Sequence, residues 1–269
     1  MLSDNWILRS DHGGGVIELS LNRAPVNALS ADFLMCFGEM LDDLATEQAV
    51  RAVVLTSPFA VFSAGLDLKE APDFDLAGQH AIVEGLNVGF LHLFSFPKPV
   101  VTAIDGAAIA GGLFFVLAAD YRVAGPRARF GLAEVRVGAE FPVGPLEIAR
   151  ATLGPNDLRR LMLTGRPVDA GTAAQSGIID ELVAQDAVVA RAIDVARDLA
   201  DNPKATYAAI KRQIRGAVIE RIELAMADGA NAPDGGWFND ETRDAMKHMI
   251  GAGRHGDQRA EMGRKDDSE

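Results

Sequence analysis

The sequence predicts a mixed α/β fold in which strand–helix units are followed by a helical C-terminal region. Up to about residue 183, short apolar runs alternate with longer segments of helical periodicity, a pattern typical of alternating strands and helices. From Asp186 onward the pattern is helical throughout. With 269 residues, 48% of them apolar and 24% charged, the chain can bury a large core. We therefore expect a mixed core over 1–185, a helical region over 186–252 and a loose charged tail over 253–269.

Two strands and a long helix are expected at the start of the chain. Residues 6–9 and 16–21 flank a glycine-rich turn at 11–15, which predicts a hairpin. Ser30 is a typical N-cap for a helix that extends to about Thr46 with one apolar face. The pattern then predicts a buried strand over 50–56, a loop over 58–65, a helix over 76–95 and a buried strand over 99–104.

The stretch 104–120 leads from a buried strand through small residues into a nearly all-apolar run, which predicts a buried helix. Gly111 and Gly112 stand at the start of that run. The first turn of a helix leaves N–H groups unpaired and carries partial positive charge. Such a turn suits a negatively charged oxygen, although a glycine pair that lets a helix pack closely on a sheet has the same sequence.

The second half of the core continues with short elements before the helical region begins. Residues 131–138 form an expected loop in which Glu134 stands among apolar and small neighbours. Asp169 is a typical N-cap for a short helix. The other expected elements are strands over 121–124, 128–130 and 178–183, and helices over 145–153, 156–164, 186–200, 204–215, 218–230 and 238–250.

Composition and charge exclude several classes of partner. The formal net charge of −12 argues against a broad nucleic-acid or anionic-membrane surface. The single cysteine, Cys36, cannot form an intramolecular disulfide and suits a reducing compartment. The sequence has no signal-like N-terminus and no apolar run of roughly 18 residues. We therefore expect a cytoplasmic protein that binds neither nucleic acid nor membranes.

The motifs favour carboxylate chemistry. The five histidines do not pair at metal-ligand spacings, and no Cys/His cluster occurs. The sequence also lacks a G-x-S-x-G elbow, a P-loop and a G-x-G-x-x-G at a strand-to-helix junction. We therefore predict no bound metal, and serine-hydrolase and nucleotide-cofactor chemistries lack their usual residues.

Three separate pieces of the chain form a candidate site if the fold brings them together. The backbone N–H groups of Leu66 and Gly111 would form an oxyanion hole, in which one donor is typically worth roughly 2.7–4 kcal/mol of transition-state stabilisation. A carbonyl polarised there becomes acidic at its α carbon, and a partly desolvated Glu134 carboxylate could then move the proton. From the residues alone, the preferred interpretation of Gly65 is an ordinary turn glycine, and that of Glu134 is a solvated loop acid.

Several motifs occur in a characteristic order and spacing between about Leu19 and Val183. They are Leu21-Asn22-Arg23 with Val26-Asn27-Ala28-Leu29, then Phe62 to Glu70, Pro97 to Val100, Gly106 to Asp120, Glu134 to Gly138, and Leu163-Thr164-Gly165-Arg166. With these motifs the chain resembles the crotonase, or enoyl-CoA hydratase/isomerase, superfamily. The resemblance implies a β-β-α superhelical core, and acyl-CoA thioesters as substrates, with no cofactor because coenzyme A is part of the substrate. It also implies a helical C-terminal region that builds trimers, often as dimers of trimers.

The resemblance also implies the roles of individual residues. The family's oxyanion hole falls on the N–H groups of Leu66 and Gly111, and the loop from Ala64 to Leu68 would hold the adenine and pantetheine parts of coenzyme A. Lys69, Lys98 and Lys211 are candidates for the phosphates, whereas Asp67 is expected to brace its loop and Asp120 to anchor a strand. The predicted substrate contacts are Val26, Ala64, Gly65, Leu66, Asp67, Leu68, Lys69, Gly111, Phe114 and Ala133.

The chain departs from the hydratases of the family at one important position. Hydratases grip a water between two glutamates, of which one falls on Glu134 and the other on Phe114. The Pro25-Val26-Asn27 turn, the apolar residue at 114 and Pro142 are closer to the mitochondrial-type Δ3,Δ2-enoyl-CoA isomerases, in which one glutamate shuttles a proton between C2 and C4. Ala133 stands where these enzymes usually have a substrate-contacting asparagine.

The preferred hypothesis is isomerisation of 3-enoyl-CoA to trans-2-enoyl-CoA with Glu134 as base and then acid. A first alternative is hydration of 2-enoyl-CoA by Glu134 together with Glu140, which lies six residues later. A second alternative is a non-catalytic member that binds acyl-CoA and does not turn it over. The direction of the Glu134 and Glu140 side chains relative to Gly111 distinguishes the first two hypotheses.

Overall fold

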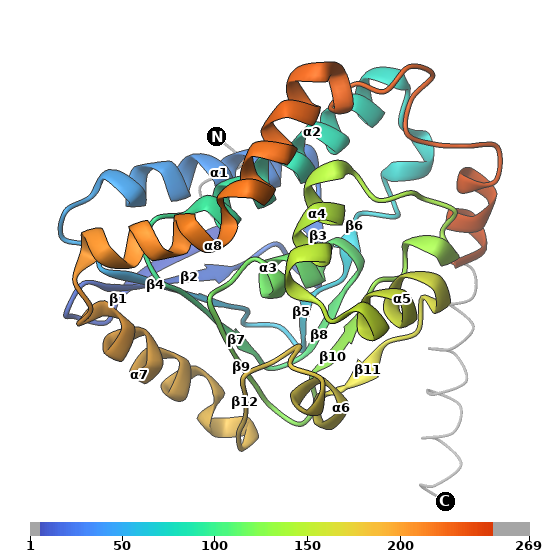
Figure 1. The fold of residues 1–269 in the computed structure, drawn as a ribbon. Helices are drawn as coiled ribbons and strands as arrows, with labels where there is room; N and C mark the ends of the chain where they lie inside the picture. Colours follow the sequence, from blue (N-terminus) through green and yellow to red (C-terminus); the bar gives the residue numbers. More distant parts are fainter. Residues whose placement is uncertain (1–5, 250–269) are drawn as a thin grey trace, which may run out of the picture.

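The computed structural model describes residues 6–249, which form two main sheets and one two-stranded sheet surrounded by helices (Figure 1). β1 is antiparallel to β2 in the larger sheet, and the other neighbouring strands are parallel. In spatial order this sheet consists of β1 (Ile7–Asp11), β2 (Val16–Leu21), β4 (Ala52–Thr56), β7 (Val100–Ile104), β9 (Tyr121–Ala124) and β12 (Glu181–Leu182). The expected tail 253–269 and the last residues of the expected region 186–252 lie outside the described residues.

The smaller sheet lies beside the larger one and has one antiparallel edge. β11 is antiparallel to its neighbour, and the other pairs are parallel. In spatial order it consists of β11 (Val168–Asp169), β10 (Arg129–Gly131), β8 (Ala107–Ile109) and β5 (Val61–Ser63). A separate parallel pair joins β3 (Ala28–Leu29) to β6 (Gly65–Leu66).

Helices surround the sheets. They are α1 (Ala31–Thr46), α2 (Leu76–Ser95), α3 (Leu113–Leu117), α4 (Val143–Thr152), α5 (Pro155–Thr164), α6 (Ala170–Gln175), α7 (Val188–Ala200) and α8 (Lys204–Ala225). Among them, α1 and α2 lie on one face of the larger sheet and α7 lies on the other. The predicted caps Ser30 and Asp169 accept hydrogen bonds from the backbone N–H groups of Phe33 and Thr172. Residues 242–249 are also helical. Within this described part, no helix is long and apolar enough to cross a membrane.

The chain alternates between the two sheets in a repeated order. β4 belongs to the larger sheet, β5 to the smaller one, and α2 follows; β7, β8 and α3 repeat this order, as do β9, β10 and α4. The expected strand-strand-helix core, followed by the helices α7 and α8, is therefore confirmed.

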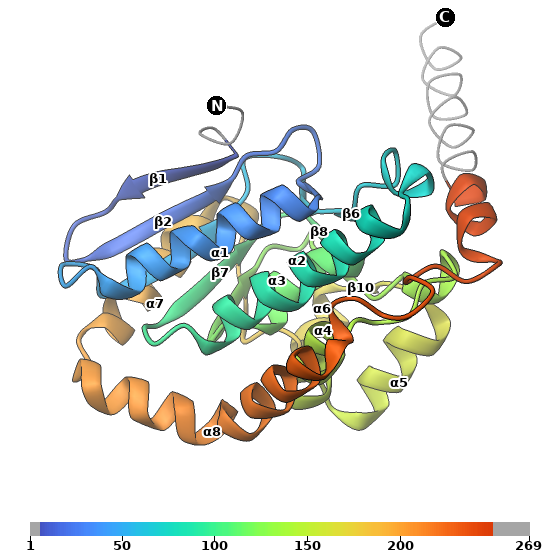
Figure 2. The same cartoon turned by 90° about the horizontal axis from the view of Figure 1, so that it is seen from above.

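Apolar layers lie on both faces of the larger sheet. Val53 and Leu55 of β4 belong to the main core with residues of α1 and α2, whereas Val54 belongs to a second cluster with residues of α7. Successive strand residues point to opposite faces, which explains why β4 is an uninterrupted apolar run. Figure 1 shows α7 below the sheet, and Figure 2 shows α1 and α2 lying side by side across its other face.

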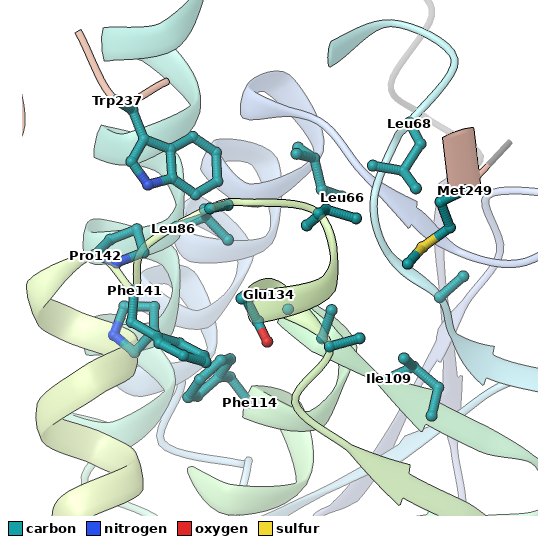
Figure 3. Close-up of a pocket in the computed structure, with 17 residues that line it drawn as sticks. Leu66, Leu68, Leu86, Ile109, Phe114, Glu134, Phe141, Pro142, Trp237 and Met249 are labelled. Carbon is teal, nitrogen blue, oxygen red and sulfur yellow. The ribbon is translucent and has the colours of Figure 1, made fainter. Parts of the chain in front are cut away.

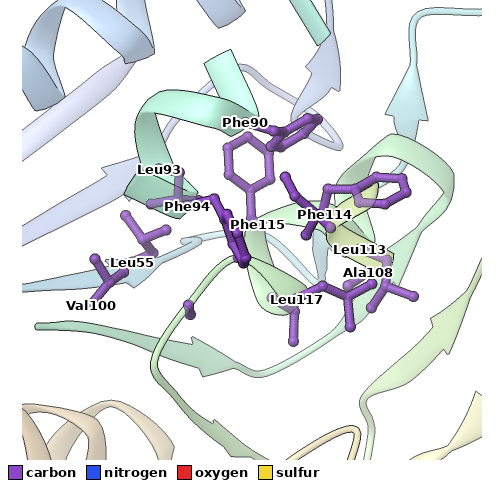
Figure 4. Close-up of a cluster of buried hydrophobic side chains, with 14 of the residues drawn as sticks. Leu55, Phe90, Leu93, Phe94, Val100, Ala108, Leu113, Phe114, Phe115 and Leu117 are labelled. Atoms are coloured by element: carbon purple, nitrogen blue, oxygen red, sulfur yellow. The ribbon is translucent and has the colours of Figure 1, made fainter. Parts of the chain in front are cut away.

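Phenylalanine rings fix α3 in the middle of the main core. The Phe115 ring makes edge-to-face contacts with Phe37 and Phe90, each with 5.1 Å between ring centroids (Figure 4). Phe115 is fully buried, so the interior holds this short helix from several sides. The turn that precedes α3, which carries Gly111, is thereby fixed in place.

Four predicted elements differ from the structure. The helices expected at 204–215 and 218–230 are one helix, α8, which passes through Gly216 because burial of Ile219 and Ile222 offsets the ~1 kcal/mol cost of an interior glycine. The loop expected at 58–65 contains β5 and the first residue of β6, which are too short to produce a periodic signal. The buried helix expected after Gly112 is only the five-residue α3, because the chain returns to the sheet in β9.

Candidate active site

An apolar pocket of about 90 Å³ lies beside Gly111 (Figure 3). One water needs only about 10–15 Å³ in this measure, so the pocket has room for a small organic group. It is lined by Ala64, Leu66, Leu68, Leu86, Ile109, Ala110, Gly111, Phe114, Ala133, Glu134, Val137, Ala139, Phe141, Pro142, Pro145, Trp237 and Met249. Among these described lining residues, Glu134 is the only one with an ionisable side chain.

The loops that carry Leu66 and Gly111 meet at Gly65. Gly65 has a φ of +79°, which favours glycine. A Cβ atom there would lie 2.8 Å from the carbonyl oxygen of Ile109 and 2.9 Å from the backbone nitrogen of Gly111. Only a residue without a side chain therefore lets the two loops approach this closely. Gly65, which the sequence indicates as a turn residue, is also the point of contact between the two loops.

The Gly111 amide lies in a short 3₁₀ turn, Ala110–Gly112, whose first N–H groups have no partner within the turn. Ala110 has a φ of +50°, an uncommon conformation for a residue other than glycine. Such conformations cluster at functional sites. Because α3 has only five residues, the helix dipole expected from the sequence contributes little, and the N–H donors of the turn are the main feature.

Glu134 also lines the pocket, at the start of the 3₁₀ turn Glu134–Arg136. Figure 3 shows its carboxyl group within the pocket, in the space surrounded by Phe114, Leu66 and Ile109. The residue is buried, and its Oε2 atom has no hydrogen-bond partner among the described residues. Burial in these apolar surroundings raises the pKa of Glu134 to about 8. A carboxyl group of this kind can both accept and return a proton near neutral pH.

One side of the pocket is aromatic. Phe114 and Phe141 contact each other edge to face, with 6.4 Å between ring centroids, and Trp237 closes the same end in Figure 3. Phe114 stands where the resemblance placed the second glutamate of the hydratases. The pocket that contains Glu134 therefore has the apolar ring of Phe114 at this position and not a second acid. Among residues 6–249, no group of three or more His, Cys, Asp or Glu side chains could hold a metal ion.

The structure divides the predicted substrate contacts into two groups. Ala64, Leu66, Leu68, Gly111, Phe114 and Ala133 line the pocket. The other four predicted contacts do not line the pocket and lie in or beside the loop from Ala64 to Leu68: Val26, Gly65, Asp67 and Lys69. The carbonyl oxygen of Val26 accepts a hydrogen bond from the Ala64 amide, and Asp67 pairs with Arg23 at 2.8 Å and accepts a hydrogen bond from the Lys69 amide. Asp67 therefore braces its loop, as expected, and the Lys69 side chain is exposed.

Three other candidates lie away from the pocket. Glu140 is exposed and is not a lining residue, so the geometry gives no support to the proposed pair of Glu134 and Glu140. The ammonium group of Lys98 donates to the carbonyl oxygens of Leu44 and Glu47. Lys211 is buried against Asp120. The ammonium groups of the two lysines are therefore engaged in contacts between structural elements. In these positions they are poorly placed to bind phosphates.

Sequence reasoning missed the contribution of the C-terminal segment. Trp237 and Met249 line the pocket, although they lie more than a hundred residues after Glu134 in the sequence. The Trp237 backbone N–H donates to Gln79 Oε1, and its indole N–H donates to the carbonyl oxygen of Glu140. The one available signal was an adjacent pair of aromatic residues, Trp237 and Phe238, in a stretch rich in glycine and proline.

Comparison with known proteins places this geometry in a family. Residues 11–229 match the family described as enoyl-CoA hydratase/isomerase. The probable enoyl-CoA hydratase echA17 of Mycobacterium avium is 35% identical over 199 residues, which cover 73% of this chain and 77% of that protein. The carnitinyl-CoA dehydratase of Citrobacter koseri is 31% identical over 208 residues, covering 75% of this chain and 77% of that protein.

The fold is also similar to that of a solved isomerase. The crystal structure of human mitochondrial Δ3-Δ2-enoyl-CoA isomerase superposes with a TM-score of 0.84 and 26% sequence identity, covering 93% of this chain and 99% of that chain. The family match covers most of the described residues, and the strand-strand-helix core has the expected architecture. The chain therefore belongs to the enoyl-CoA hydratase/isomerase family, the crotonase superfamily, and is an acyl-CoA enzyme of that family.

Proposed function

We propose that the protein isomerises 3-enoyl-CoA to trans-2-enoyl-CoA. The observation that carries the proposal is a single buried carboxyl group, Glu134, which faces an apolar pocket beside the Leu66 and Gly111 loops. The similarity to the human Δ3-Δ2-enoyl-CoA isomerase supports this reaction. It requires no water, no metal and no redox partner, because the substrate and product have the same atoms.

In the proposed mechanism, the thioester oxygen accepts hydrogen bonds from the N–H groups of Leu66 and Gly111. The ionised Glu134 carboxylate removes a proton from C2, and the C2–H electron pair moves to give a dienolate whose negative oxygen lies between the two donors. Glu134 then returns the proton to C4 while the double bond forms between C2 and C3. One acid therefore acts as base and then as acid, and ends in its starting state.

Hydration of 2-enoyl-CoA is the second candidate, because relatives named as hydratases and dehydratases match the chain. Hydration needs a group that positions and activates a water, and the phenyl ring of Phe114 cannot do so. The exposed position of Glu140 also favours isomerisation over hydration. A member that binds acyl-CoA without turnover is the third candidate.

We also propose that the loop from Ala64 to Leu68 binds the pantetheine and adenine parts of coenzyme A, with Val26 and Asp67 supporting the loop and Lys69 near the phosphates. Assembly into a trimer or a dimer of trimers is proposed for the C-terminal helices. Large apolar side chains on α8, Ile210, Ile214 and Leu224, are exposed in the single chain. Apolar surface of this kind is typical of a protein interface.

The proposal is tested by assaying the purified protein with 3-enoyl-CoA and with crotonyl-CoA. We expect isomerisation of the first substrate, and a loss of kcat of about 10²–10⁴-fold in Glu134→Gln. Glu140→Gln is the matched control, because it changes an exposed acid six residues away and should leave kcat unchanged. Isomerisation that survives Glu134→Gln would contradict the proposal. Hydration that depends on Glu140 would favour the second candidate, and acyl-CoA binding without turnover of either substrate would favour the third.

A further inference from the structure

Among residues 6–249, no side chain forms a hydrogen bond that fixes the direction of the Glu134 carboxyl group. Its Oε2 atom is buried without a hydrogen-bond partner among the described residues, and the carboxyl group accepts a hydrogen bond from its own backbone amide. A buried side chain held in this way takes its orientation from the local main chain. The position of the carboxyl group therefore depends on what holds the loop that carries it.

That loop closes on itself at Gly138. The backbone N–H groups of Val137 and Ala139 both donate to the carbonyl oxygen of Glu134, at 3.0 and 3.1 Å. Gly138, between them, has a φ of +64°. A displacement of the Gly138 peptide is thus transmitted to Glu134 through two hydrogen bonds within a single tight turn.

A distant part of the chain holds the Gly138 peptide. The Thr242 hydroxyl donates to the carbonyl oxygen of Gly138 at 2.6 Å, and the side-chain amide of Asn239 donates to the same oxygen at 3.2 Å. A Cβ atom on Gly138 would lie 3.2 Å from the Cα atom of Thr242, so the two main chains are in direct contact. Thr242 is fully buried, which strengthens its hydrogen bond to the loop.

The segment that carries Thr242 is itself firmly attached. Gln79 Oε1 on α2 accepts hydrogen bonds from the backbone N–H groups of Trp237 and Phe238, both at 2.9 Å. Met246, one helical turn after Thr242, is buried in an apolar cluster with Val137 and Ala139, the two neighbours of Gly138. Residues 237–246 therefore form a rigid support that connects α2 to the Glu134 loop.

We propose that Thr242 is a positioning residue, whose hydroxyl group holds the Gly138 carbonyl and so directs the Glu134 carboxyl group at the reacting carbons of the acyl chain. The identity of the reaction rests on the function proposed above. The link from Thr242 through Gly138 to Glu134 rests on the contacts alone.

Thr242→Val tests the link because valine keeps the volume of threonine and removes its hydroxyl group. We expect kcat with 3-enoyl-CoA to fall about 10- to 100-fold, as small displacements of catalytic groups do, while KM changes less than about twofold. Thr242→Ser keeps the hydroxyl group and should restore most of the rate. Thr152→Val is the matched control, because the Thr152 hydroxyl makes a similar 2.7 Å bond to the Ile148 carbonyl oxygen in α4. An unchanged kcat in Thr242→Val would overturn the proposal.

A readout without substrate separates this proposal from the proposed function. The infrared carboxyl band of Glu134, identified by its loss in Glu134→Gln, can be titrated in each variant. We expect a shifted midpoint in Thr242→Val and the wild-type midpoint in Thr242→Ser and Thr152→Val. A shifted midpoint in Thr242→Val, together with a wild-type protein that catalyses no isomerisation, would disprove the reaction and support the link. Identical midpoints in all three variants would overturn the link.

Asn239→Asp provides a second variant if Thr242→Val does not fold. Asn239 Oδ1 accepts hydrogen bonds from the backbone N–H groups of Glu241 and Thr242, and aspartate retains this cap. The substitution replaces the side-chain amide group that donates to the Gly138 carbonyl oxygen with an oxygen atom, which cannot donate. We expect a shift of the Glu134 midpoint and a lower kcat in this variant as well, and wild-type values for both would contradict the proposal.

Discussion

Two enclosed carboxyl groups of this protein, Asp120 and Glu134, have opposite surroundings. The Asp120 side chain is 11% exposed, accepts hydrogen bonds from Lys211 at 2.6 Å and from the Val100 backbone N–H at 2.8 Å, and forms an ion pair with Arg215 at 2.8 Å. Glu134 is buried among apolar side chains, and its Oε2 atom has no partner within residues 6–249. One acid is surrounded by cations, and the other faces a pocket.

The difference separates a structural acid from a candidate catalytic acid. Asp120 connects the start of β7 to α8, and its charge is balanced by two cations. Burial lowers the pKa of Lys211 to about 8, so this cluster depends on the Asp120 charge to keep the lysine protonated. Burial without a cation raises the pKa of Glu134 to about 8 instead. A group with that pKa can exchange a proton with a substrate, whereas Asp120 is committed to its partners.

The largest expected effect tests the structural side of this comparison. Asp120→Asn leaves Lys211 and Arg215 without a balancing charge, and we expect the free energy of unfolding to fall by about 3–5 kcal/mol. The kcat of the folded protein should stay close to the wild-type value. Urea denaturation measures the first quantity. Asp194→Asn removes an exposed ion pair with Arg197 and is the control, with an expected change within about 0.5 kcal/mol. Equal losses of unfolding free energy in Asp120→Asn and Asp194→Asn would contradict the assignment of Asp120 as a structural acid.

The next effect tests the catalytic side. Gly65→Ala places a Cβ atom 2.8 Å from the Ile109 carbonyl oxygen and pushes the Leu66 and Gly111 loops apart. We expect kcat to fall about 10²–10³-fold, the cost of losing one oxyanion donor. Gly177→Ala is the matched control, because Gly177 has a φ of +76° and open space around its Cα atom. It carries the same backbone strain, so an equal loss of kcat in both variants would assign the effect to strain alone.

The smallest effect is the pH dependence of the reaction. Glu134 acts first as a base and must be ionised, and its pKa is raised from 4.5 to about 8. The rate should therefore be low below this pKa and rise as the pH passes through it. We expect kcat/KM to increase roughly tenfold between pH 7 and pH 9. Steady-state kinetics across this range measures the profile. A profile that is flat above pH 6 would show that the catalytic acid lies in polar surroundings.

The parts of the site that are local in sequence could be predicted from it. Gly65, Gly111 and Glu134 each stand in a short segment whose composition indicates a turn or an apolar environment. The replacement of a second acid by Phe114 is visible in the sequence, and the structure places this ring in the pocket. Asp120 and Asp67 were also correctly predicted to anchor a strand and to brace a loop.

The parts that depend on distant contacts could not be predicted. Trp237 and Thr242 reach the Glu134 loop from about a hundred residues away, and no periodicity connects them to it. The left-handed conformation of Ala110 is imposed by packing on a residue that does not favour it. A lysine is ordinarily expected on the protein surface. Only the fold shows that Lys211 is buried against Asp120.

The most direct test of the central claim follows one proton through the reaction. A 3-enoyl-CoA substrate that carries deuterium at C2 should give a 2-enoyl-CoA product with deuterium at C4, because a lone Glu134 shielded from water removes and returns the same nucleus. Mass spectrometry of the product measures this transfer in the wild-type protein and in Glu134→Gln. We predict substantial transfer in the wild type and none in the variant. Transfer that persists in Glu134→Gln, or isomerisation without any transfer in the wild type, would contradict a mechanism based on one buried acid.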